Sequence, residues 1–115
     1  MQLNALKLLE DIRLGCEDIS DFTKDVTSAN DFIRNNLLHS AVERKLEIIG
    51  EATNKLLKNH PDIEINNARQ IISLRNLIIH SYDNLDLFQI WAIIKTKLPE
   101  LKKEVIDLIN KFEKL

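Results

Sequence analysis

The chain has 115 residues, of which 44% are hydrophobic and 30% are charged, a balance typical of a folded soluble domain rather than a disordered chain. Sixteen basic and 18 acidic residues give a formal net charge of −2, so bulk charge neither favours nor excludes nucleic acid as a partner. The single cysteine excludes an internal disulfide, and no uncharged apolar run approaches the roughly 18 residues of a membrane span, so we expect a cytoplasmic protein.

Glycine and proline occur only twice each, which is too few for many short strands. We therefore predict an all-α fold in a single domain, residues 1–115. The first helix is predicted over about 2–26, where apolar residues recur at intervals of three and four. Gly15 inside this helix costs about 1 kcal/mol relative to alanine, which indicates close packing at that position.

A second helix is predicted from about 29 to 59. Ser28 is its expected N-cap, and the helix is expected to stop before Pro61. At about 1.5 Å per residue, this helix would be roughly 45 Å long, the reach of a bundle helix.

Two further helices follow a longer loop. The third is predicted over about 67–82, with Asn66 or Asn67 as its N-cap, and the fourth from about residue 86, with Asn84 or Asp86 as its N-cap.

Pro99 lies in the last predicted helical segment, where it either kinks one helix or begins a fifth helix as its first residue. Four or five helices with short connections predict an up-and-down bundle. The apolar faces are wide for so small a chain, so we expect a homodimer.

The stretch LRNLIIHSYDNLD, residues 74–86, places Arg75, His80 and the only tyrosine, Tyr82, among apolar side chains. At about 100° per residue, Asn76 and His80 share the polar face of a helix, whereas Arg75 and Tyr82 lie in its apolar arc. Arg75 and His80 then point about 140° apart. They can converge if the helix loosens near His80, if the long arginine wraps round the helix, or if a second protomer completes the site.

An arginine in an apolar arc needs an acid or an anionic ligand, since a buried guanidinium without a partner costs several kcal/mol. Glu43, Glu47 and Glu51 are spaced by four and form an acidic stripe on the second predicted helix. We expect one of these three carboxylates to approach Arg75, and Glu51 is the one we favour.

Arginine and histidine together can cleave RNA without a metal ion. Histidine can take a proton from the 2′-OH or give one to the leaving oxygen, and arginine can hold the phosphate with two hydrogen bonds. The structural alternatives are an ion pair for Arg75, a surface position for His80 and a packing role for Tyr82. We take His39 and His60 as surface residues, and no residue spacing suggests a metal or a cofactor.

The segment RNLIIHSY matches the R-x4-H-x-Y pattern of the HepT-like toxins of the HEPN superfamily, and residues 41–52 and 74–101 resemble further blocks of that family. This resemblance implies a dimeric bundle of four or five helices, with Arg75 and His80 as a ribonuclease pair and Asn76 as the polar residue that follows the arginine. Ser81 departs from the family pattern, in which a glutamate is frequent here.

The resemblance also implies a partner, a small nucleotidyltransferase antitoxin of the MNT type that can adenylylate Tyr82 and so block the entry of RNA. The alternative function is a binding module without catalytic activity, which only scaffolds such a nucleotidyltransferase or holds a small anion at Arg75.

Overall fold

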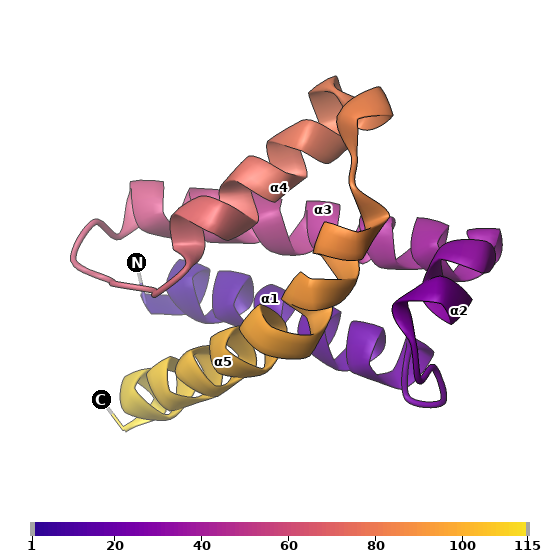
Figure 1. Cartoon of the computed structure of the whole chain (residues 1–115). Helices are drawn as coiled ribbons and strands as arrows, with labels where there is room; N and C mark the ends of the chain where they lie inside the picture. Colours follow the sequence, from indigo (N-terminus) through magenta and orange to yellow (C-terminus); the bar gives the residue numbers. More distant parts are fainter. Residues whose placement is uncertain (1, 115) are drawn as a thin grey trace.

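The helices of the protein are connected by short turns and by one longer loop (Figure 1). The computed structural model describes the backbone of residues 2–114 and the side chains of residues 4–114. Its elements in chain order are α1 (Gln2–Phe22), α2 (Ala29–Arg34), α3 (Asn36–Asn59), α4 (Ala68–His80), the 3-10 turn η1 (Tyr82–Asn84) and α5 (Leu87–Glu113). These residues contain no strand, so the predicted all-α class is confirmed.

The core lies between α1, α3 and α5. Helix α1 packs against both α3 and α5, whereas α4 packs mainly on α3 and rises away from the rest of the bundle towards its C-terminal end (Figure 1). Large side chains that are fully buried in this core include Leu9, Ile12, Leu46, Ile49 and Leu101. Burial of each such side chain stabilises the fold by about 1.5–3 kcal/mol. The C-terminal end of α4 therefore projects from the packed core formed by α1, α3 and α5.

The first helix is shorter than predicted, because α1 ends at Phe22 rather than near residue 26. The Thr23 hydroxyl donates to the Ile19 carbonyl oxygen at 2.8 Å, and the Val26 amide turns back to the Thr23 carbonyl at 3.0 Å. The Val26 bond spans three residues rather than the four of an α-helix, so the chain forms a turn at this point. The close packing predicted at Gly15 is confirmed, since a Cβ there would lie 2.6 Å from Cγ1 of Ile49.

The predicted helix over residues 29–59 is two helices. Ser28 caps α2 as expected, accepting a hydrogen bond from the Asp31 amide at 3.2 Å. Asn35 then leaves the helical region, with φ −95° and ψ 90°, and its side chain accepts from the Leu38 amide at 3.0 Å. This side chain is the N-cap of α3, and it replaces the helical hydrogen bonds that the break removes.

The ends of α4 and α5 also refine the prediction. Helix α4 ends at His80, two residues early. Asn67 precedes it in the left-handed region, with φ 65°, which asparagine tolerates better than most residues. Asp86 caps α5 as predicted, and Pro99 lies inside this single helix, so no separate helix begins there.

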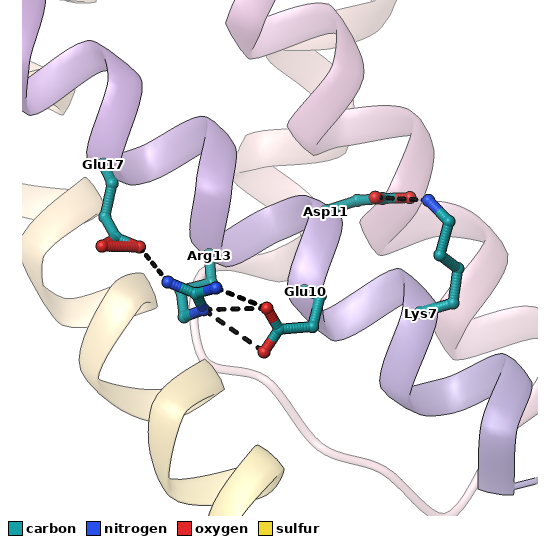
Figure 2. Close-up of polar contacts among 5 residues, drawn as sticks. All are labelled: Lys7, Glu10, Asp11, Arg13 and Glu17. Atoms are coloured by element: carbon teal, nitrogen blue, oxygen red, sulfur yellow. Dashed lines mark hydrogen bonds and ion pairs between the residues drawn. The ribbon is translucent and has the colours of Figure 1, made fainter.

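Ion pairs line the solvent side of α1 (Figure 2). Lys7 pairs with Asp11 at 2.6 Å, and the Arg13 guanidinium lies between the carboxylates of Glu10 and Glu17. The hydrogen bond from Arg13 lowers the pKa of Glu10. Pairs of this spacing stabilise a helix by about 0.3–0.5 kcal/mol each. Arg13 is therefore saturated by acids of its own helix and is not available to an anionic ligand.

Candidate functional site

An open groove of about 460 Å³ lies at the C-terminal end of α4. It is lined by Ser73, Asn76, Leu77, His80 and Ser81. Asn76 and His80 are exposed and lie one turn apart, which confirms the shared polar face predicted from their spacing. His80 is the last residue of α4, so its imidazole stands at the C-terminal end of this helix.

Arg75 does not line this groove but is hydrogen-bonded to a residue that does. Its Nη1 donates to Oδ1 of Asn76 at 2.9 Å, and Asn76 lines the groove together with His80. The convergence of Arg75 and His80 by any of the three routes stays a prediction. Asn76 is the link between the guanidinium and the groove.

The stem of Arg75 crosses α3 at a glycine. A Cβ on Gly50 would lie 2.3 Å from Cβ of Arg75 and 2.9 Å from its Cγ. Only glycine allows α4 to approach α3 this closely at that position. The arginine is half-buried, and its Nε atom is buried without a hydrogen-bond partner.

The acidic partner predicted for Arg75 is wrong. Glu51 is exposed, its Oε1 pairs with Nζ of Lys55 at 3.3 Å, and it lines a pocket between α1 and α3. Residue 50, not residue 51, faces α4, and a step of one residue turns a side chain by about 100°. Among the residues that the structure describes, no carboxylate pairs with Arg75, in contrast to Arg13. The guanidinium therefore keeps donors for a ligand.

Tyr82 lies outside the helix in which it was predicted. It begins the turn η1 and its side chain is 52% exposed, so the predicted place in the apolar arc of a helix is wrong. Its hydroxyl donates to Oε1 of Glu43 on α3 at 2.7 Å. This hydrogen bond to a carboxylate raises the pKa of Tyr82, because it stabilises the protonated phenol.

Sequence reasoning missed the residues that hold Tyr82. Glu43 is only 5% exposed, and its second oxygen, Oε2, lies 2.8 Å from Nδ1 of His39. His39 is buried against Phe32, with ring centroids 6.2 Å apart, and His60 is buried as well, so the surface positions predicted for both histidines are wrong. A signal was available, since residues 39 and 43 are one helical turn apart and share a face.

The described residues contain neither a metal site nor a membrane span. Within residues 2–114, no group of three or more histidine, cysteine, aspartate or glutamate side chains is placed to hold a metal ion. None of the helices described has both the length and the apolarity that a membrane span needs.

The fold and the groove define a class of protein: an all-α bundle in which an asparagine and a histidine line a groove at the end of one helix and an arginine is hydrogen-bonded to that asparagine. The family model described as Ribonuclease HepT-like matches residues 12–108. The chain belongs to the HepT-like ribonuclease family.

Curated relatives agree with this assignment. The protein named "Putative RNase MJ1380" from Methanocaldococcus jannaschii is 39% identical over 101 residues, which cover 84% of this chain and 89% of the relative. The protein named "Probable ribonuclease HepT" from Thermococcus cleftensis is 36% identical over 111 residues, which cover 93% of this chain and 91% of the relative. No solved structure gives a significant match to the chain.

Proposed function

We propose that this protein is an endoribonuclease that cleaves RNA without a metal ion, with Arg75 and His80 as its catalytic residues and Asn76 as the residue that positions Arg75. The observation that carries the proposal is the link from an arginine without a carboxylate partner, among the described residues, through Asn76 to the groove lined by His80. Membership of a ribonuclease family supports it.

The proposed reaction uses the nucleophile that RNA itself carries. Arg75 holds a phosphodiester and stabilises the charge that develops on its oxygens. The 2′-oxygen attacks the adjacent phosphorus and the bond to the 5′-oxygen breaks, which leaves a cyclic phosphate and a free 5′-hydroxyl. His80 takes the proton of the 2′-OH or gives one to the leaving oxygen.

This reaction needs both an acid and a base, and the groove of one protomer contains a single histidine. A homodimer that brings two grooves together would supply the second imidazole. Apolar side chains that stand exposed in the single chain favour such a partner, among them Leu37 at 83% and Phe88 at 60%.

The test compares wild-type protein with Arg75→Ala and His80→Ala in RNA cleavage with EDTA present. Loss of one acid–base or phosphate-binding group should lower the rate about 10²–10⁴-fold. Arg69→Ala is the matched control, an exposed arginine of the same helix that does not line the groove. Equal rates in all four proteins would refute the proposal and leave the alternative, a helical module that only binds a nucleotidyltransferase.

We also propose that the protein is the toxin of a toxin–antitoxin pair, restrained in the cytoplasm by an MNT-type nucleotidyltransferase that adenylylates Tyr82 or binds the toxin directly. An exposed tyrosine two residues after His80 supports this role. Expression without the partner should arrest growth, and His80→Ala should not. After co-expression, intact mass should increase in steps of one AMP, and Tyr82→Phe should abolish the increase.

A further inference from the structure

A buried carboxylate holds the hydroxyl of Tyr82. Glu43 accepts the Tyr82 hydrogen bond through Oε1 at 2.7 Å, and His39 meets Oε2 through Nδ1 at 2.8 Å. A carboxylate can only accept hydrogen bonds, so Nδ1 of His39 carries the hydrogen of the second bond. Both oxygens of Glu43 are thus used, as a buried carboxylate requires.

The positions of Glu43, His39 and Tyr82 indicate that these residues do more than anchor the turn η1. Glu43 and His39 come from the first turns of α3 and are buried, whereas the tyrosine ring is half-exposed. A hydroxyl oxygen that donates one hydrogen bond keeps two lone pairs. Tyr82 therefore combines a solvent-facing ring with a hydroxyl that has its proton directed at a fixed base.

We infer that Glu43 is the general base that makes Tyr82 a nucleophile towards activated phosphoryl groups, and that His39 is the residue that positions Glu43. The inference rests on the proposed modification of Tyr82 and adds a role for this chain's own residues in that reaction. In nucleotidyl transfer, Oη of Tyr82 forms a bond to the α-phosphorus of a nucleoside triphosphate. The bond from that phosphorus to the oxygen that bridges the α- and β-phosphates breaks, and pyrophosphate leaves. The phenolic proton passes to Oε1 of Glu43 and then to water.

Two effects of Glu43 oppose each other, and this opposition makes the inference testable. The hydrogen bond to Glu43 raises the pKa of Tyr82, which lowers the fraction of free phenolate. A base within hydrogen-bond distance removes the need for free phenolate, since the proton leaves as the new bond forms. If Glu43 only locks the hydroxyl, its neutralisation should speed the reaction. If Glu43 is a base, its neutralisation should slow the reaction.

The experiment uses diethyl 4-nitrophenyl phosphate, which needs neither RNA nor a transferase. Attack by Tyr82 forms a phosphorus–oxygen bond and releases 4-nitrophenolate, which is measured by absorbance, and peptide mass mapping locates the label on Tyr82. Glu43→Gln keeps the shape of the side chain and an acceptor oxygen but not the base. We expect it to lower the rate of Tyr82 labelling at least about 10-fold at pH 7.

Matched variants separate the base from general effects on the surface. Glu47→Gln neutralises the next acid of the same stripe, which pairs with Arg44, and should label at the wild-type rate. His39→Leu should label more slowly than wild type. His39→Asn should recover much of the rate, because its amide nitrogen can take the place of Nδ1.

A pH profile gives a second readout, and its wild-type arm does not depend on the fold of any variant. Attack by free phenolate rises tenfold per pH unit below the phenol pKa, which is about 10 for an ordinary tyrosine. Wild-type labelling should rise less steeply than this between pH 7 and pH 8, and Glu43→Gln should follow the full slope.

Faster labelling of Glu43→Gln than of wild type, or a tenfold rise in wild-type labelling per pH unit, would overturn the inference. Glu43 would then only hold the Tyr82 hydroxyl in its protonated form. Either result would leave the ribonuclease proposal unaffected, because RNA takes no part in the experiment. Loss of RNA cleavage in the His80→Ala comparison, or its persistence, would in turn leave the role of Glu43 unaffected.

Discussion

Replacing Gly50 with alanine tests the contact that places Arg75 beside the groove. The new Cβ would lie 2.3 Å from Cβ of Arg75 and 3.3 Å from the carbonyl oxygen of Ile71. Both atoms are held by the backbone of α4, so no rotation of a side chain relieves the overlap. Helices α3 and α4 must therefore move apart, and Arg75 must move with α4.

The magnitude follows from two opposing terms. Alanine gains about 1 kcal/mol of helix propensity over glycine, and overpacking at a rigid contact costs about 3 kcal/mol, the upper part of its usual range. The net destabilisation is about 2 kcal/mol, which corresponds to a fall in Tm of about 8 °C for a domain of this size. We also expect Gly50→Ala to lower RNA cleavage, because the added Cβ displaces Cβ and Cγ of Arg75 and with them the guanidinium.

Gly15→Ala is the matched control, since Gly15 is the other glycine of the chain and also lies inside a helix. Its Cβ would meet the side chain of Ile49, at 2.6 Å from Cγ1 and 3.0 Å from Cδ1, and a side chain can shift where a backbone cannot. The net cost should stay below about 1 kcal/mol. Thermal melts followed by circular dichroism measure the change in Tm of each variant relative to the wild type. If Gly50→Ala melts at or above the wild-type temperature, or if Gly15→Ala loses more, the close approach of α3 and α4 is wrong.

Three further predictions concern the helix cap, the tyrosine and the cysteine. Asp86→Ala should lower stability by about 1 kcal/mol, because Asp86 caps two amides of α5, and Asn84→Ala should melt like the wild type. Absorbance titration should place the pKa of Tyr82 above 10, and Glu43→Gln should lower this pKa. Because the folded-state pKa is raised, the stability due to the hydrogen bond is present below pH 10 and is lost as pH rises through the folded pKa. The wild type should therefore lose more stability than Tyr82→Phe between pH 9 and 11. Burial raises the pKa of the Cys16 thiol to about 12, so a disulfide reagent at pH 8 should modify it only after unfolding in urea; fast modification of the native protein would refute its burial.

Periodicity was enough to predict the helices but not the points at which they break. Apolar residues recur on both sides of Asn35, and the break there is capped by one side-chain hydrogen bond to the Leu38 amide. Asparagine serves inside a helix or as a cap, and its immediate surroundings decide which.

The shared face of Asn76 and His80 could be predicted from the sequence because both residues lie on one regular helix at a spacing of four. How Arg75 and His80 would meet could not be predicted, since a loosened helix, a wrapping arginine and a second protomer were all open. Contacts between helices could not be placed this way. Glu51 was chosen from an acidic stripe, but the face that α3 turns to α4 carries Gly50, and such a rotation depends on packing that periodicity alone does not specify.

The break after His80 brings the two candidate sites of this chain onto one face of α3. Had α4 continued, Tyr82 would lie about 200° round the helix from His80. Because the chain leaves the helix at Ser81, Tyr82 reaches Glu43, whereas Arg75 packs on Gly50 of the same helix. These two positions on α3 are seven residues apart, which is two turns, or about 10 Å.

That separation is comparable to the distance over which charges act on one another at physiological ionic strength, about 8 Å. A phosphate attached to Tyr82, as proposed, would therefore act on Arg75 through space as well as by its bulk. It would repel the phosphodiester of an incoming RNA and attract the guanidinium that should bind it. The proposed modification of Tyr82, a residue outside the groove, would in this way inhibit RNA binding at the groove without contact with His80.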